Sequence, residues 1–283
     1  MDTHQNRAKK TADSRETRTP RPDQQETGGT IDAAELVKGN IPPWVRRFVK
    51  SAGRGINRYR MIKEHDTVLL GISGGKDSLA LALALSLRKT WLPIDYSLEA
   101  LHIDWEEYPV PPEKLDILHG FFKQIGVPLK SVKARMFPDS FNGEFNCYLC
   151  SRNRRRILFE HARDRGITKI ALGHHLDDLV ETSLINLCFR GEFSTMRPVQ
   201  EFFSGKLFVI RPLVEVKETV IIRLTEACNL PVVKIDCPYK DTNIRNSLKP
   251  IVRSLSHIDR YTRNHIYKAH NGAGHFPDLP FDG

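Results

Sequence analysis

Short runs of apolar and β-branched residues alternate along the chain with longer segments in which apolar residues recur at helical spacing. The apolar runs lie at Thr67–Ile72, Ser97–Ile103, Leu129–Val132, Lys169–Leu172, Leu207–Ile210 and Val232–Ile235. The helical patterns lie at about 78–90, 112–125, 151–165, 177–189 and 216–228. Continuous apolar strands are typical of a parallel sheet that helices cover on both faces. The pattern therefore predicts an α/β fold with a doubly wound, mostly parallel sheet flanked by helices.

The two ends of the chain depart from this alternation. Residues 1–30 contain only three apolar residues, so they cannot bury enough surface to offset the entropy of ordering. Apolar residues at helical spacing between Trp44 and Val49 predict an amphipathic helix that leads into the domain. We expect a disordered or weakly ordered tail at 1–40, a leading helix at 41–62, the α/β domain at 63–242, and C-terminal helices with an irregular tail at 243–283.

The charge of the chain is concentrated in its folded part. The 283 residues carry a formal net charge of +9, and basic and acidic residues balance within 1–40. A basic domain attracts polyanions such as nucleic acid, because each neutralised phosphate releases condensed counterions. The sequence contains neither a long apolar stretch nor a signal-peptide pattern. These features predict a cytoplasmic protein that has no membrane partner.

A glycine-rich loop follows the first predicted strand. Ser73-Gly74-Gly75-Lys76-Asp77-Ser78 lies between that strand and a segment of good helix formers. Adjacent glycines let the backbone approach a phosphate, and the helix N-terminus directs N–H groups towards it. The glycine spacing matches neither a Walker A loop nor a Rossmann fingerprint. The loop is predicted to hold phosphate, and the simpler alternative is a glycine turn with a capping serine.

Ser-Gly-Gly-x-Asp-Ser resembles the PP-loop of ATP pyrophosphatases such as tRNA-lysidine synthetase and the tRNA thiolation enzymes. Members of that superfamily cleave ATP between the α and β phosphates, which implies AMP and pyrophosphate as products. The resemblance implies that the six loop residues bind ATP and cradle the leaving pyrophosphate. It also makes Asp77 a candidate catalytic residue that helps to hold Mg²⁺.

Two further strand ends carry polar residues. Asp104 follows the second apolar run and resembles the family segment that reaches the nucleotide, although a capping or solvated aspartate is an equal alternative. The segment Gly173-His174-His175-Leu176-Asp177-Asp178 follows the fourth run and resembles the Gly-His-His-x-Asp-Asp of tRNA thiolation enzymes. The resemblance implies that Gly173 binds ATP and that His174 and Asp177 are catalytic. We expect Asp178 to cap the helix that follows.

The chain has five cysteines, an odd number in a protein too large to depend on disulfide bonds. Cys147 and Cys150 form a Cys-x-x-Cys just before a predicted helix, and Cys237 stands apart. Three thiolates can hold an iron–sulfur cluster with one iron left open, whereas a structural zinc site normally needs four ligands. A redox disulfide and a zinc site completed by histidine remain alternatives at this point. Cys188 and Cys228 are predicted to pack in the core.

Cys-Tyr-Leu-Cys-Ser-Arg-Asn-Arg-Arg, beginning at Cys147, resembles the Cys-x-x-Cys-Ser-Arg-x-Arg-Arg of the tRNA 2-thiocytidine synthetase family (TtcA). In that family two cysteines here and a third near the end of the domain bind a [4Fe–4S] cluster. The resemblance therefore implies Cys147, Cys150 and Cys237 as the metal ligands. The tails of the chain lie outside the resemblance, which spans about 62–245.

Arginines crowd the helix predicted after the cysteine pair. Their guanidinium groups match the geometry of phosphate oxygens, so we expect RNA contacts, although a solvated basic helix is the simpler alternative. The four candidates are Arg152, Arg154, Arg155 and Arg156. A base in a tRNA loop must be turned out of its stack to be reached by an enzyme.

The resemblance implies ATP-dependent thiolation of a tRNA cytidine at C2, at position 32 in the family. ATP, Mg²⁺ and a [4Fe–4S] cluster are the cofactors it implies, and tRNA and a sulfur donor such as a cysteine desulfurase are the partners. A homodimer is left open. The rivals within the superfamily are a lysidine-synthetase-like ligase and a 2-thiouridine synthase. A rival of another class is a non-catalytic iron–sulfur and RNA-binding redox sensor.

Overall fold

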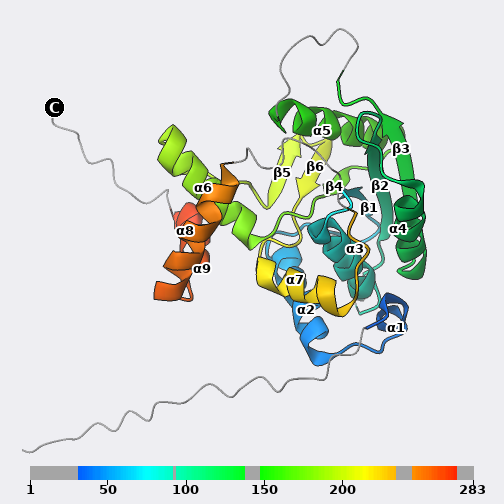
Figure 1. Ribbon diagram of the computed structural model, residues 1–283, viewed down its shortest axis with the longest axis horizontal. Helices are drawn as coiled ribbons and strands as arrows, with labels where there is room; N and C mark the ends of the chain where they lie inside the picture. The colour runs from blue at the N-terminus through cyan, green and yellow to red at the C-terminus, as the bar shows by residue number, and fades with distance from the viewer. Residues whose placement is uncertain (1–30, 92–93, 138–146, 234–243, 273–283) are drawn as a thin grey trace, which may run out of the picture.

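The computed structural model describes residues 31–91, 94–137, 147–233 and 244–272. A six-stranded sheet with the order β3-β2-β1-β4-β6-β5 forms the centre of the molecule (Figure 1). Strands β1 to β6 span Thr67–Ile72, Ser97–Trp105, Leu129–Ala134, Lys169–Ala171, Val199–Phe202 and Leu207–Ile210. All pairings are parallel except that of β5 with β6. The prediction of a mostly parallel α/β sheet is confirmed.

Helices lie on both faces of this sheet. Helices α1 to α9 span Ala33–Val37, Pro43–Arg58, Lys76–Lys89, Pro112–Gln124, Cys147–Asp164, Leu176–Arg190, Glu218–Ala227, Arg245–Ile258 and Thr262–Gly272. Alternate residues of β1 point to opposite faces. Val68 and Leu70 join one buried cluster that includes α2, α3 and α7, whereas Leu69 joins a second cluster with Leu158 of α5. This two-sided burial explains the continuous apolar run that predicted β1.

Two strand assignments differ from the sequence predictions. The antiparallel edge strand β5 was not predicted, because its sequence Val-Gln-Glu-Phe is neither continuously apolar nor longer than four residues. Val232 and Val233 do not form the predicted strand; the Val233 N–H donates instead to the Gly74 carbonyl at 2.9 Å. The remainder of that run, 234–235, lies outside the described residues.

Helix α1 lies within the range that we assigned to an N-terminal tail. Its Leu36 is fully buried, and Asp32 caps it by accepting a hydrogen bond from the Ala34 N–H at 2.9 Å. Packing against α3 and α4 thus orders a segment that is too short to be a helix by itself. Residues 1–30 lie outside the described part of the chain.

The C-terminal helices α8 and α9 pack against α6 on one side of the sheet (Figure 1). Ser183 of α6 and His270 of α9 are hydrogen-bonded at 2.6 Å. The hydroxyl of Tyr59, the C-cap residue of α2, is hydrogen-bonded to that of Tyr267 in α9, and this bond joins α9 to the first long helix. Among the helices of the described residues, none combines the length and apolar composition that crossing a lipid bilayer requires.

Candidate functional site

The glycine-rich loop follows β1, at the point in the sheet where the strand order reverses. Strands β1 and β4 are neighbours, and the chain proceeds outward from them to opposite edges of the sheet. In such folds ligands bind beyond the carboxyl ends of the strands at this point. The loop after β1 and the Gly-His-His segment after β4 therefore share the expected binding edge.

Hydrogen bonds within the loop give it a defined shape. Gly74 has a φ of +79°, which a residue with a Cβ rarely adopts. The Gly75 N–H donates to the Ser73 hydroxyl at 3.3 Å, and the Ser78 hydroxyl donates to the Gly75 carbonyl at 2.8 Å. The loop leads directly into the N-terminus of α3, which carries partial positive charge. This geometry suits a phosphate group.

Gly173 allows the segment after β4 to lie against the loop. A Cβ added at Gly173 would lie 2.8 Å from the backbone carbon and oxygen of Asp77 and 3.0 Å from the nitrogen of Ser78. The two backbones therefore touch, and any side chain at this position would push them apart. The structure brings the predicted residues Gly173 and Asp77 together.

The loop lysine forms ion pairs with two carboxylates. Lys76 Nζ lies 2.7 Å from Asp77 Oδ1 and 3.1 Å from Glu218 Oε1. Burial disfavours the charge on Lys76, but Asp77 and Glu218 outweigh that effect and raise its pKa. Lys76 thus stays cationic, as a phosphate-binding lysine requires.

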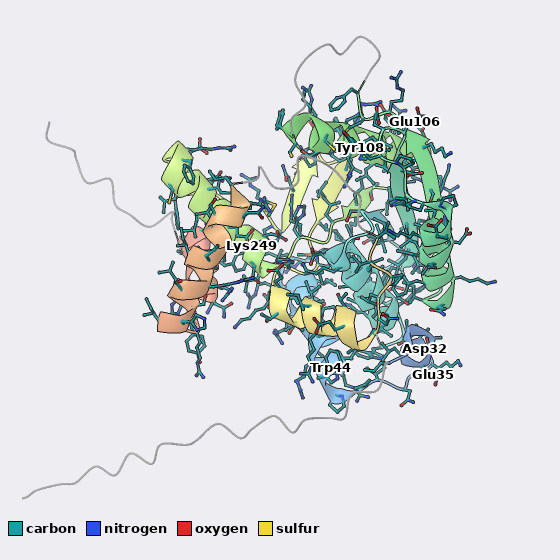
Figure 2. The ribbon with its side chains drawn as sticks, in the orientation of Figure 1. Asp32, Glu35, Trp44, Glu106, Tyr108 and Lys249 are labelled. Atoms are coloured by element: carbon teal, nitrogen blue, oxygen red, sulfur yellow. The ribbon has the colours of Figure 1, made fainter. Side chains whose placement is uncertain are left out.

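Glu218 was missed by the sequence analysis. It is the first residue of α7. Lys249 extends from the side of α8 that faces the sheet (Figure 2), and its Nζ lies 3.4 Å from Glu218 Oε1. Burial alone would raise the pKa of Glu218, but Lys76 and Lys249 outweigh it and lower that pKa. The only signal in the sequence was an acidic residue at a predicted helix start.

His175 was also missed, because adjacent histidines give no indication of which one faces the loop. It is buried, and its Nε2 lies 3.5 Å from Asp77 Oδ1. His175 also forms a capping box with Asp178: the Asp178 N–H donates to His175 Nδ1 at 3.4 Å, and the His175 N–H donates to Asp178 Oδ2 at 3.0 Å. Asp178 thus has the capping geometry expected of it.

Asp177, a predicted catalytic residue, is buried and both its oxygens are occupied. Oδ2 accepts a hydrogen bond from the Glu218 N–H at 2.7 Å, and Oδ1 pairs with Arg263 of α9. Asp177 therefore holds α6, α7 and α9 together. These contacts favour a positioning role over direct contact with substrate.

His174 and Asp104 occupy different surroundings. His174 Nδ1 is buried and has no hydrogen-bond partner in the described part of the chain. Burial, with Arg211 as the next cause, lowers the pKa of His174 to about 4, so the ring is neutral at pH 7. Asp104 is buried near the end of β2, where its Oδ1 accepts a hydrogen bond from the Val110 N–H at 2.8 Å. That bond fixes the turn after β2, a structural task for Asp104.

The cysteine pair occupies the first turn of α5. Cys147 is exposed and Cys150 is half-buried. Residues three apart on a helix face the same side, and a helix N-terminus favours thiolates. The two side chains therefore suit part of a metal or cluster site. Cys237, the third predicted ligand, lies outside the described residues, and within the described ranges no group of three or more potential ligands converges.

The other two cysteines behave differently from each other. Cys228 is buried, and burial raises the pKa of its thiol to about 11, in agreement with a packing role. Cys188 is exposed, so its predicted core position is wrong. The last turns of α6 project beyond the core, and the neighbouring Leu187 is exposed as well.

The arginines of α5 are not equivalent. Arg154 is half-buried and lies over the Trp105 ring at 5.6 Å, and Arg156 Nη1 pairs with Glu160 at 2.8 Å. Arg152 and Arg155 are exposed, and no carboxylate pairs with either within the described residues. These two are the arginines best placed for a phosphate backbone.

A mostly parallel sheet with a phosphate-binding loop at its switch point defines an α/β nucleotide-binding protein. The PP-loop domain family matches residues 46–253, and the chain belongs to that family.

The chain is similar to tRNA-cytidine(32) 2-sulfurtransferase from Burkholderia cenocepacia strain HI2424, with 37% identity over 216 residues that make up 74% of this chain and 63% of that protein. The enzyme of the same name from Burkholderia lata is 36% identical over the same shares. The chain thus spans less than two thirds of the length of these relatives.

The fold is also similar to the solved structure of U34-tRNA thiolase NcsA from Methanococcus maripaludis with its [4Fe–4S] cluster. The TM-score is 0.66 at 22% identity, and the match covers 83% of this chain and 80% of that one. This likeness concerns the fold alone.

Proposed function

We propose that this chain is an ATP-dependent tRNA sulfurtransferase that activates a cytidine at C2, at position 32 of tRNA, for replacement of its oxygen by sulfur. The observation that carries the proposal is the combination of the PP-loop geometry with Cys147 and Cys150 on the first turn of α5. The names of the sequence relatives support the same substrate. We also propose that the activity is cytoplasmic, because the proposed substrate is tRNA.

In the first step the cytidine carbonyl oxygen attacks the α-phosphate of ATP, and pyrophosphate leaves. The N-terminus of α3 and the charge of Lys76 stabilise the pyrophosphate as negative charge develops on it. Asp77, next to Lys76, would help to hold Mg²⁺ against the phosphates. Asp104 and Gly173 belong to the same edge of the sheet, and Gly173 lets the segment after β4 close against the loop.

In the second step a sulfur nucleophile replaces the adenylated oxygen, and AMP leaves. Cys147, Cys150 and Cys237 would hold a [4Fe–4S] cluster, which when bound supplies an iron with an open position for sulfide. Arg152 and Arg155 of α5 would bind the RNA backbone beside the cysteines. A cysteine desulfurase is the proposed sulfur donor.

Product analysis separates this proposal from its rivals. The protein, prepared anaerobically, is incubated with ATP, Mg²⁺, sulfide, lysine and unmodified tRNA, and the nucleosides are examined by mass spectrometry. 2-Thiocytidine together with tRNA-dependent pyrophosphate release is the expected result. A lysine adduct would indicate a ligase, 2-thiouridine would change the substrate base, and no pyrophosphate release would favour a non-catalytic RNA-binding protein.

The loop variant Asp77→Asn makes the test specific. It should lose pyrophosphate release and keep its fold, because a half-exposed loop carboxylate is not part of the core. Asp116→Asn on the exposed side of α4 is the matched control. Turnover at the wild-type rate in Asp77→Asn would reject the proposed ATP chemistry at this loop.

A further inference from the structure

A buried arginine follows β6, at the same edge of the sheet as the glycine-rich loop, and pairs with no carboxylate of the described residues. Arg211 follows β6 and is only 6% exposed. Its Nη1 donates to the Arg197 carbonyl and its Nη2 donates to Gln200 Oε1 at 3.3 Å, while its Nε has no hydrogen-bond partner in the described structure. The guanidinium group of Arg211 has five N–H donors and hydrogen-bonds to only two acceptors, both uncharged, among the described residues.

Among the described residues, nothing neutralises the charge of Arg211. In the part of the chain that the structure describes, no carboxylate lies within ion-pair distance of it, and the charged group that acts on it most is Arg155 of α5. Burial, followed by Arg155, lowers the pKa of Arg211 to about 10, so the side chain is still cationic at pH 7. An isolated buried charge is costly unless a counter-charge or ligand accompanies it.

Strand pairing places His174 next to this arginine. Ala171 of β4 is aligned with Ile210 of β6, and the Leu172 N–H donates to the Ile210 carbonyl at 3.0 Å. The chain therefore leaves β4 towards His174 and leaves β6 at Arg211 along the same edge of the sheet. His174 contributes a neutral ring with an unsatisfied Nδ1, and exposed Arg155 lies close enough to Arg211 for the two charges to interact.

We propose that Arg211, Arg155 and His174 form a second phosphate-binding site, separate from the glycine-rich loop. The ligand is a phosphate oxyanion, which two guanidinium groups bind with matching geometry. Two sources carry that group: the α-phosphate region of ATP and the RNA backbone next to the target base. These two sources follow from the proposed function. The existence of a phosphate-binding site at Arg211 does not depend on that function.

Binding measurements test the site without turnover. Arg211→Met removes the charge, and Gln200→Ala is the matched control, because it removes one neutral hydrogen bond of Arg211 and leaves the charge. Affinities are measured by calorimetry for α,β-methylene-ATP and by salt titration for unmodified tRNA. Arg211→Met should weaken one of the two ligands about tenfold or more, the usual effect of losing a charged hydrogen bond. Gln200→Ala should bind both like the wild type.

The pattern of loss identifies the source of the phosphate. Weaker tRNA binding, with a salt slope reduced by about one, assigns the site to the RNA backbone. Weaker binding of the ATP analogue with unchanged tRNA affinity assigns it to the nucleotide. Wild-type affinity for both ligands in folded Arg211→Met overturns the proposal. A loss of affinity in Gln200→Ala equal to that in Arg211→Met also overturns it, because Arg211 would then have only a structural role.

A second variant covers the case in which Arg211→Met does not fold. Arg155 is exposed, so Arg155→Met should leave the fold intact while weakening the same ligand, and unchanged affinities for both ligands would overturn the proposal. Failure of the proposed function is distinguishable, because it appears as absence of thiolated product in the wild type. Phosphate binding at Arg211 would remain measurable in that case.

Discussion

Gly173 lies where two backbones touch, so it tests the shape of the loop site. A methyl group there would meet Asp77 and Ser78 backbone atoms at 2.8–3.0 Å, and backbone cannot rotate away as a side chain can. Gly173→Ala should destabilise the fold by about 1–3 kcal/mol, as overpacking does, and weaken binding of an ATP analogue. Thermal unfolding and calorimetry measure the two effects.

Gly120 supplies the control for that substitution. It lies in the exposed side of α4, and nothing would meet an added Cβ within 4 Å. Gly120→Ala should stabilise the protein by about 0.5–1 kcal/mol and leave nucleotide binding unchanged. Wild-type affinity in Gly173→Ala would show that the contact with Asp77 does not shape the nucleotide site.

Glu181 of α6 makes the stability of the protein depend on pH. It is 3% exposed, and burial raises its pKa to about 7 from an ordinary value of 4.5. Because the folded protein binds this proton more tightly, the stabilisation is present below pH 4.5 and is lost as the pH rises through 7. Glu181→Gln should therefore gain on the order of 1–2 kcal/mol at pH 8 and almost nothing at pH 4.5.

Urea unfolding of wild type and Glu181→Gln across this pH range measures the difference. Glu192→Gln, at an exposed position, serves as the control and should show little change at either pH. A gain of equal size at both pH values would mean that titration of Glu181 is not the cause.

At the scale of elements, Asp177 joins three helices. It caps α7, whose N-cap residue Lys217 makes no side-chain capping bond, and it pairs with Arg263 of α9. Removing one partner of a buried ion pair costs about 3–5 kcal/mol, and losing a cap costs about 1 kcal/mol. Asp177→Ala should therefore destabilise the fold more than Asp177→Asn, which keeps an acceptor for the α7 cap.

Denaturant unfolding of Asp177→Asn, Arg263→Ala and the double variant measures the coupling. The double variant should be far less destabilised than the sum of the two single changes. If Asp177→Asn instead unfolds like the wild type and loses all pyrophosphate release, Asp177 is catalytic, as the sequence resemblance implied.

The two exposed arginines on helix α5 are expected to bind the phosphates of tRNA. Replacing Arg152 and Arg155 by alanine should reduce the salt slope of tRNA binding by about two, since each lost phosphate contact removes about one counterion. Arg163→Ala, at the far end of α5 and paired with Asp164, is the control and should leave the slope unchanged. An unaltered salt slope in the double variant would mean that Arg152 and Arg155 are solvated and do not contact RNA phosphates.

For the whole molecule, the iron content tests whether distant parts of the chain share one site. Anaerobically prepared protein should contain about four irons and four sulfides per chain. Cys147→Ala, Cys150→Ala and Cys237→Ala should each lose the cluster, whereas Cys188→Ala and Cys228→Ala should retain it. Equal iron in all five variants, or one zinc and no iron in the wild type, would contradict the cluster assignment.

The sequence by itself determined the features that are encoded within a few consecutive residues. The apolar run of β1, the helix formers of α3 and the glycines between them specify strand, phosphate loop and helix, because backbone preference and burial pattern act locally. The Cys-x-x-Cys spacing likewise placed two thiols close together in the sequence, just before a predicted helix, whereas the structure extends that helix, α5, back to Cys147 and so includes both.

Only the tertiary structure decided which side chains meet. His175 rather than His174 approaches Asp77, Glu218 pairs with Lys76, and Arg263 binds Asp177 across 86 positions of sequence. Arg211 pairs with no carboxylate in the described part of the chain for the same kind of reason. Such pairings depend on how β4, β6 and the C-terminal helices pack around the edge of the sheet. A pattern of neighbouring residues in the sequence does not determine that packing.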